Sequence, residues 1–246
     1  MAAKRAVVTG GGRGIGRAVA SALSAAGHHV TILGRNEATL KDTVEAGGAD
    51  DYRVADVSDP ESLEAVLAGI GAVDILVNNA GAADSAPFLK TDDAHFRSLM
   101  AVNFESVVTA TRAVLPGMIE RTFGRVISVA SIAGLKGVRY AAAYAASKHA
   151  VVGLTRSIAL EVGKHGVTVN AVCPGYVDTD IVTEGVKRIV ARTGRTPEEA
   201  MAVFTRDNPQ GRLIAVDEVA DAVLWLSGDG ASGVNGQAIV VSGGEG

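Results

Sequence analysis

The stretch that decides the fold is AVVTGGGRGIG, residues 6–16. A short β-branched run, Ala6–Thr9, leads directly into a glycine turn, and the Ala-rich segment Ile15–Ala26 that follows has the pattern of a helix. Glycines here leave no Cβ atoms in the way of a phosphate group, which then meets free N–H groups at the positive end of a helix. Glycines also occur in ordinary tight turns, but a strand, a glycine turn and a helix in this order predict a dinucleotide-binding unit.

The rest of the chain repeats this alternation of short apolar runs and longer Ala-rich amphipathic stretches. Such an alternation forms βαβ units and a parallel sheet with helices on both faces, and strands buried on both faces are apolar throughout. We therefore predict an α/β fold: a single doubly wound Rossmann-type domain over residues 1–246 with a mostly parallel seven-stranded sheet. Strands are expected at 6–9, 30–33, 52–55, 73–78, 125–129, 168–172 and 237–241; helices at 15–26, 37–45, from 58 or 59, and at 92–121, 142–164 and 216–226, with an irregular, more charged region before the last.

Composition excludes several classes of function. Of the 246 residues, 48% are hydrophobic and 20% charged, and the net charge of −4 comes from interspersed acids and bases. A nucleic-acid-binding protein would show a basic patch, and a membrane protein a long uncharged apolar run, so neither partner is expected. The one cysteine, Cys173, excludes an internal disulfide, the five scattered histidines form no metal motif, and residues 1–5 are unlike a signal peptide. We expect a cytoplasmic protein without a metal.

The choice of dinucleotide depends on the end of the second strand. Proteins that bind NAD usually place an acidic residue there, which holds the ribose hydroxyls. This chain has Gly34 followed by Arg35, and a second arginine, Arg13, lies inside the glycine turn. Without a carboxylate, nothing repels a 2′-phosphate, and an arginine can bind it through two hydrogen bonds. NADP(H) is therefore favoured, with NAD(H) as the alternative if both arginines are merely solvated surface residues.

A second constellation carries acid–base chemistry. Tyr144 and Lys148 are four residues apart at the start of a predicted helix, so the phenol and the ammonium lie on one face. A nearby ammonium, together with an oxidised nicotinamide, stabilises a phenolate and lowers the pKa of the phenol, which can then exchange a proton with a carbonyl or alcohol oxygen. Ser131 follows the strand 125–129 at the sheet edge where such folds bind ligands. The alternatives are a helix surface pair and a loop serine bonded to its own backbone.

Together these motifs resemble the short-chain dehydrogenase/reductase family, and the resemblance covers essentially the whole chain. The turn Thr9–Gly16 agrees in type and spacing (Gly-x-x-x-Gly-x-Gly), and Ser131 precedes Tyr144 by the usual thirteen residues. The family's enoyl reductases place six residues between the tyrosine and the lysine, so the three here favour carbonyl chemistry. Further matches are Asn78–Gly81 after the fourth strand, Asn103 in a long helix, and Pro174 and Gly175 with Val177 and Thr179.

The resemblance implies a catalytic role for four residues. Tyr144 would be the general acid/base, and Ser131 would orient the substrate carbonyl. Lys148 would bind the nicotinamide ribose and depress the pKa of the tyrosine. Asn103 would place a water molecule that links the lysine to solvent as a proton relay.

The resemblance also implies the cofactor contacts. Asp56 and Val57 would lie against the adenine, although a turn or a helix cap is an equal interpretation of Asp56. The segment after the fourth strand would border the cofactor, and the segment after Pro174 would hold the nicotinamide. The expected cofactor-binding residues are Gly10, Gly12, Arg13, Gly14, Ile15, Gly16, Arg35, Asp56, Val57, Asn79, Ala80, Gly81, Tyr144, Lys148, Pro174, Gly175, Val177 and Thr179.

Within the family, the sequence most resembles bacterial 3-oxoacyl-[acyl-carrier-protein] reductases. Substrate choice would depend on Tyr176 and on a lid at about 180–212. Bases in this lid would attract an anionic tail such as a phosphopantetheine, unless they are simply the solvated face of an amphipathic helix, which we favour because acidic residues partly balance them. These bases are Lys187, Arg188, Arg192, Arg195, Arg206 and Arg212.

Three functions remain open from the sequence. The first is an NADP(H)-dependent reductase of a 3-oxoacyl thioester or similar ketone, whose partner is a small-molecule carbonyl or alcohol. The second is an NAD-dependent dehydrogenase of a secondary alcohol or a hydroxyacyl-CoA in a degradative pathway. The third is a non-catalytic NADP(H) sensor. Family members are usually tetramers, and the apolar runs 142–146 and 238–241 fit either such interfaces or a buried core.

Overall fold

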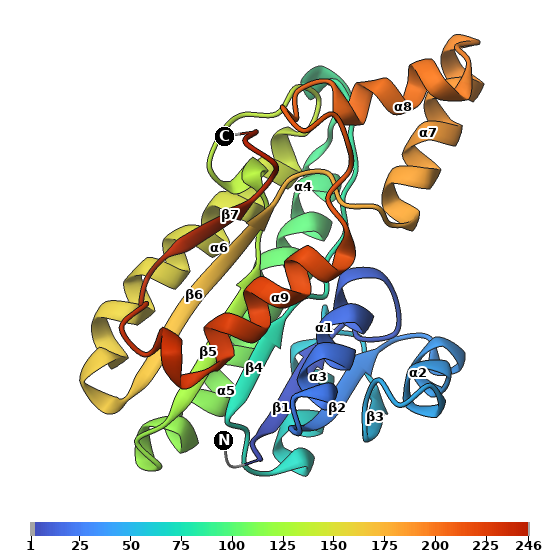
Figure 1. Cartoon of the computed structure of the whole chain (residues 1–246). Coiled ribbons are helices and arrows are strands. Elements are labelled where there is room, and N and C mark those ends of the chain that lie inside the picture. The colour runs from blue at the N-terminus through green and yellow to red at the C-terminus, as the bar shows by residue number, and fades with distance from the viewer. Residues whose placement is uncertain (1–2, 246) are drawn as a thin grey trace.

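The computed structural model describes residues 3–245, so residues 1, 2 and 246 of the expected domain lie outside the described part of the chain. Its centre is a seven-stranded sheet with the order β3-β2-β1-β4-β5-β6-β7 (Figure 1). Every neighbouring pair of strands is parallel. The Rossmann-type α/β architecture is thereby confirmed. The strands are β1 (Arg5–Thr9), β2 (His29–Gly34), β3 (Asp51–Val54), β4 (Ile75–Asn78), β5 (Gly124–Val129), β6 (Val167–Pro174) and β7 (Ala238–Val241).

Helices cover both faces of the sheet, which explains why the strands are apolar throughout. Successive residues of β1 enter different cores: Val8 packs on the side of α1 (Gly14–Ala25) and α9 (Val216–Ser227), whereas Val7 packs on the opposite side. Burial of both faces removes the polar alternation of a half-exposed strand. The other helices are α2 (Glu37–Glu45), α3 (Pro60–Ile70), α4 (Asp93–Met100), α5 (Ser106–Glu120), α6 (Ala142–Val162), α7 (Asp180–Thr193) and α8 (Pro197–Thr205).

The structure corrects two expectations about secondary structure. The helix expected at 92–121 is divided into α4 and α5 by a π-helical turn, Ala101–Glu105, which contains Asn103. A π turn widens the helix locally, and such turns are frequent at functional sites. The region expected to be irregular instead forms α7 and α8, which project from the body of the molecule in Figure 1. The start of α8 carries a complete capping box, in which Thr196 and Glu199 satisfy each other's backbone N–H groups.

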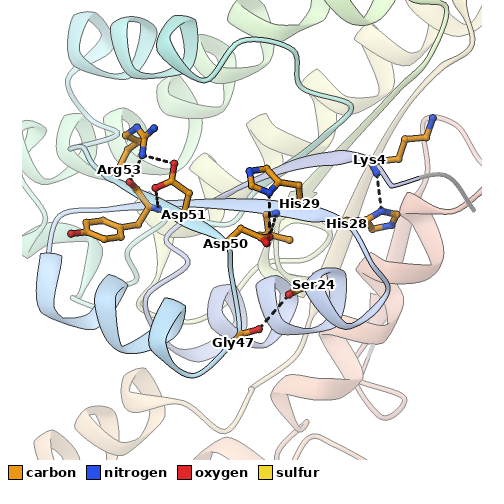
Figure 2. A network of polar contacts seen from close by, with 10 residues as sticks. Lys4, Ser24, His28, His29, Gly47, Asp50, Asp51 and Arg53 are labelled. Atoms are coloured by element: carbon orange, nitrogen blue, oxygen red, sulfur yellow. Dashed lines mark hydrogen bonds and ion pairs between the residues drawn. The ribbon is translucent and has the colours of Figure 1, made fainter.

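Polar contacts hold the beginnings of β1, β2 and β3 together, at the edge of the sheet where the strands begin (Figure 2). The carboxylate of Asp50 accepts a hydrogen bond of 2.7 Å from the N–H of Val30 and lies 3.6 Å from Nδ1 of His29. Nδ1 of the buried His28 accepts a bond from the N–H of Lys4. Burial of its ring lowers the pKa of His28, as suits an imidazole that acts as an acceptor. These contacts lie at the opposite edge from the glycine turn and are structural.

Candidate active site

The glycine turn between β1 and α1 has the geometry of a phosphate site. Gly10 (φ 68°) and Gly14 (φ 51°) adopt left-handed backbone conformations, and a Cβ on Gly16 would overlap the carbonyl oxygen of Gly10. Only glycine adopts these conformations without strain. Arg13 stands at the N-cap of α1, but its side chain makes no capping hydrogen bond. The N–H groups of the first helical turn are therefore available, and the turn fits a dinucleotide pyrophosphate.

Thr9 locks this turn onto the segment that follows β4. Its Oγ1 accepts hydrogen bonds of 3.0 Å from the N–H groups of both Asn79 and Ala80. In return, Nδ2 of Asn79 donates to the carbonyl oxygens of Thr9 at 2.9 Å and of Gly10 at 3.2 Å. The two cofactor-binding segments expected from the sequence thus lie side by side. Thr9 itself was missed as a site residue, although its place at the end of the first strand was a usable signal.

Asn103, Gly81 and Lys148 come together behind the glycine turn. The Asn103 side chain is 1% exposed; its Nδ2 donates to the carbonyl of Ala82 at 2.9 Å and to Oγ of Ser147 at 3.0 Å, and its Oδ1 accepts from the N–H of Ala82. A Cβ on Gly81 would stand 2.9 Å from Oδ1 of Asn103 and 3.6 Å from Nζ of Lys148. Glycine at position 81 therefore permits this close approach. Ser147, which the sequence analysis did not single out, completes the contact between α6 and the π turn.

Tyr144 and Lys148 lie on one face of α6, as their spacing predicts. Nζ of Lys148 is 5.8 Å from the centroid of the Tyr144 ring and donates a hydrogen bond of 2.9 Å to the carbonyl of Val129, at the end of β5. Burial lowers the pKa of Lys148 to about 8. Ser131 follows β5, and its Oγ accepts a bond of 3.1 Å from the N–H of Ala133.

In the chain alone, burial dominates the pKa of Tyr144. Burial raises the pKa of the phenol, and a side-chain hydrogen bond with Ser131 acts in the opposite direction but is the smaller effect. The lowering expected from the sequence includes the charge of an oxidised nicotinamide as well as that of Lys148, and it stays a prediction for the protein with its cofactor bound. Desolvation here outweighs the favourable contacts of the phenolate, because the surrounding protein replaces water that would stabilise the charge. The chain alone therefore keeps this phenol protonated.

The segment after β6 borders the glycine turn. The N–H of Gly175 donates to the carbonyl of Val241 at 3.0 Å, and Val177 forms a parallel bridge with Ile214. A Cβ on Gly14 would stand 3.4 Å from Cγ2 of Thr179. The segment that starts at Pro174 therefore runs from the sheet to the turn, as the expected cofactor contacts require.

The residues expected at the adenine end have protein partners of their own. Arg35 lies 3.8 Å from Asp56, and Arg13 lies 3.4 Å from Asp180, with both arginines largely exposed. Asp56 also accepts hydrogen bonds from the N–H and Oγ of Ser58, which lower its pKa, so it forms the turn before α3. Val57 is 7% exposed and belongs to the core. The structure does not pair the two arginines with each other, and adenine contacts by Asp56 and Val57 remain predictions.

Most of the bases in the α7–α8 segment are neutralised locally. Four of the six have an acidic partner within 4 Å, which supports the interpretation of this segment as a solvated face rather than an anion trap. The ring of Phe204 packs edge-on against Tyr176 at 5.1 Å between centroids and thereby joins α8 to the segment after β6. The pairs are Lys187–Glu184, Arg188–Asp84, Arg206–Asp207 and Arg212–Glu218.

Three further features of the described residues bear on the extent of the site. A groove of about 760 Å³ between α1 and α9 borders Gly14 and Thr179 but contains none of the four catalytic candidates. Within residues 3–245, no group of three or more His, Cys, Asp or Glu side chains is placed to hold a metal ion. No helix in this part of the chain is both long enough and apolar enough to cross a membrane.

Comparison with known proteins agrees with this geometry. Residues 4–189 match the family model for short chain dehydrogenases. A 3-oxoacyl-[acyl-carrier-protein] reductase of Escherichia coli is 36% identical over 248 residues, which cover 98% of this chain and 96% of the relative. A D-beta-hydroxybutyrate dehydrogenase of Rhizobium meliloti is 34% identical over 252 residues, or 98% of each chain.

Solved structures agree as closely. An actinorhodin polyketide ketoreductase variant solved with NADPH superposes with a TM-score of 0.94 and is 37% identical, covering 99% of this chain and 97% of that one. Fold, motifs and overall similarity agree along nearly the entire length of both chains. The protein is therefore an oxidoreductase that belongs to the short-chain dehydrogenase/reductase family.

Proposed function

We propose that this chain reduces a ketone to a secondary alcohol with NADPH, using Tyr144 as the general acid. The observation that carries the proposal is the convergence of Ser131, Tyr144, Lys148 and Asn103 beside the glycine turn, at the edge of the sheet where β4 and β5 end. Ligands of open α/β sheets bind at this edge. The convergence joins a phosphate-binding turn to an acid–base group, which is the combination that hydride transfer to a carbonyl requires.

The residues divide the reaction as follows. When bound, the nicotinamide supplies the hydride. Ser131 donates a hydrogen bond to the substrate oxygen and holds it beside the phenol, and Tyr144 donates its proton to that oxygen as charge develops on it. Lys148, fixed by the carbonyl of Val129, binds the ribose on the same face of α6 as Tyr144. The amide of Asn103 is occupied by Ala82 and Ser147, so its part is to hold the π turn in place for a water relay.

NADP(H) is the proposed cofactor. β2 ends at Gly34, so no carboxylate from that strand repels a 2′-phosphate, and Arg35 follows immediately. The polyketide ketoreductase mentioned above was solved with NADPH. NAD(H) is the less favoured alternative. The second candidate function, oxidation of a secondary alcohol, is supported by the D-beta-hydroxybutyrate dehydrogenase among the relatives.

The proposed substrate class is a 3-oxoacyl thioester or a similar ketone, because the relatives include a 3-oxoacyl-[acyl-carrier-protein] reductase. The decisive experiment follows cofactor oxidation by absorbance, with NADPH and NADH in parallel and a short 3-oxoacyl thioester as substrate. We expect turnover with NADPH and little with NADH. Turnover with NADH alone would contradict the cofactor assignment. No turnover with either cofactor, once cofactor binding is verified separately, would exclude this thioester and move the substrate to another ketone or alcohol.

Arg35 provides a test of cofactor choice. We expect Arg35→Ser to reduce the preference for NADPH over NADH by about tenfold, since one charge-assisted contact with phosphate is lost. Asp180→Asn should shift the preference the other way, because Arg13 is freed from its partner at 3.4 Å. The ratio of kcat/KM for the two cofactors is the measurement. A ratio unchanged by Arg35→Ser would remove Arg35 from the cofactor site.

We further propose a single-domain protein that acts in the cytoplasm as a homotetramer, with α7 and α8 as the substrate lid. Large apolar side chains are exposed on three of its elements: Leu160 on α6 at 88%, Trp225 on α9 at 47% and Val240 on β7 at 45%. Two of these elements, α6 and β7, also contain the apolar runs 142–146 and 238–241 that the family resemblance assigns to subunit interfaces. The single free cysteine, Cys173, suits a reducing compartment.

A further inference from the structure

The segment Ser242–Glu245, which follows β7, folds back over the active-site edge of the sheet. Oγ of Ser242 donates a hydrogen bond of 2.5 Å to the carbonyl of Glu245 and closes the turn. Gly243 (φ 66°) and Gly244 (φ 99°) adopt backbone conformations that other residues rarely take. The turn is therefore built into the sequence, and it presents the Glu245 side chain to the protein rather than to solvent, since this side chain is only 8% exposed.

This turn contacts the segment after β6, which the family resemblance assigns to the nicotinamide. A Cβ on Gly175 would stand 3.2 Å from Cβ of Ser242 and 3.6 Å from Oε2 of Glu245. Tyr176 also lies close: burial, followed by the negative charge of Glu245, raises the pKa of its phenol. The Glu245 carboxylate therefore lies beside the residues that follow β6.

The same turn contacts the base of the α7–α8 segment. A Cβ on Gly243 would overlap the side chain of Asn208, and a Cβ on Gly244 would stand 3.1 Å from Cγ of Pro209. Asn208 in turn donates a hydrogen bond of 2.8 Å to the carbonyl of Arg212. The turn thus packs against the residues through which the chain leaves α8.

The third contact is an ion pair with the loop of Ser131. Nζ of Lys136 lies 3.3 Å from Oε1 of Glu245, and the two residues are 109 positions apart in sequence. The Lys136 side chain is 35% exposed, so water reaches its ammonium group, whereas the Glu245 carboxylate is largely shielded from water. Removing one partner of such a pair leaves a poorly solvated charge, which is strongly unfavourable when the charge is buried. We expect the Lys136–Glu245 ion pair to hold the loop that follows Ser131 (residues 132–141) against the turn Ser242–Glu245.

We propose that Lys136 and Glu245 are positioning residues for ketone reduction: their ion pair holds the loop of Ser131 against the segment after β6, and so sets the substrate carbonyl relative to Tyr144. The inference rests on the proposed function. Neither residue needs to touch the reacting atoms. A displacement of about 1 Å between the substrate and a catalytic group lowers the rate of the chemical step by as much as about a hundredfold, because orientation is part of the catalysis.

The test compares Glu245→Gln and Lys136→Met with the wild type. We expect each variant to lower kcat for the ketone by about tenfold, with the Kd of NADPH changed less than about twofold, since the glycine turn is untouched. The charge-swapped double variant, Lys136→Glu with Glu245→Lys, should recover most of the lost kcat. The matched control is the exposed pair Lys41–Glu37 on α2, 3.1 Å apart, where Lys41→Met and Glu37→Gln should leave kcat unchanged.

Hydrogen–deuterium exchange provides a readout that needs no substrate. Glu245→Gln should accelerate exchange in residues 132–141 and 174–178, and leave residues 5–34 unchanged. Wild-type kcat in both variants, in an enzyme that does turn over the ketone, would overturn the positioning role. Unchanged exchange in residues 132–141 and 174–178 would show that the Lys136–Glu245 ion pair does not hold these two segments together. If the wild type does not reduce the ketone but exchange in Glu245→Gln is accelerated, the proposed function is refuted. The structural role of the Lys136–Glu245 ion pair is then supported independently.

Discussion

Tyr144→Phe is expected to lower kcat by about a thousandfold, within the range of about 10²–10⁴ that a positioned general acid contributes. The substitution removes one oxygen from a side chain that touches the substrate oxygen in the proposed mechanism, and it leaves the glycine turn intact. The Kd of NADPH should therefore change little. Initial rates at saturating NADPH, together with cofactor binding followed by fluorescence, measure the two quantities separately.

Ser131→Ala is the matched comparison for this variant. It removes a hydrogen bond to the substrate oxygen but leaves the proton donor in place, so its loss of kcat should be smaller than that of Tyr144→Phe. Retention of even a tenth of the wild-type rate by Tyr144→Phe would remove Tyr144 as the acid. Full biological function of that variant would instead favour the non-catalytic NADP(H) sensor.

The pKa of Tyr144 indicates the protonation state of this phenol in the chain without cofactor. Burial raises the pKa of Tyr144, so at neutral pH the phenol carries the proton that reduction consumes. Oxidation of an alcohol needs the phenolate, which the buried environment disfavours. The chain on its own is thus set for donation of a proton.

The fold could be predicted from the sequence because two signals agree along the chain. The glycine stretch after the first strand marks the nucleotide-binding unit, and the alternation of apolar runs with amphipathic helices fixes the parallel sheet. The π turn at Asn103 was not predicted, because no glycine or proline stands near residues 101–105 to mark an interruption of the helix. The helix α8 could have been found from the Thr196-Pro197-Glu198-Glu199 start that produces its capping box.

The candidate site was predictable where spacing within one helix or one turn decides the contact. Tyr144 and Lys148 are neighbours because they are four residues apart. Contacts between distant segments had no such signal: Ser147 meets Asn103 across 44 residues, and Lys136 meets Glu245 across 109. The direction of the pKa shift of Tyr144 also depends on burial, which the sequence does not reveal.

Lys148→Met is expected to have two opposite effects, a loss of kcat of about a hundredfold or more and a gain in stability. The pKa of Lys148 falls from 10.5 to about 8 in the folded protein because the ammonium is buried. At about 1.4 kcal/mol per pKa unit, keeping this charge at pH 7 costs the fold about 3 kcal/mol. The lost hydrogen bond to the carbonyl of Val129 offsets about 1 kcal/mol of the gain. We expect Lys148→Met to raise the free energy of unfolding at pH 7 by about 1–2 kcal/mol.

The pH dependence identifies the cause. Between pH 8 and 10.5 the unfolded chain binds the lysine proton and the folded protein does not, so wild-type stability rises with pH across this window relative to the variant. The advantage of Lys148→Met, measured by urea unfolding at pH 7 and at pH 9.5, should therefore shrink at the higher pH, whereas the exposed control Lys41→Met should show no such change in this range. A variant less stable than the wild type at pH 7 would contradict the argument. A side chain whose removal strengthens the fold and lowers kcat by about a hundredfold or more is retained for its chemistry and not for stability.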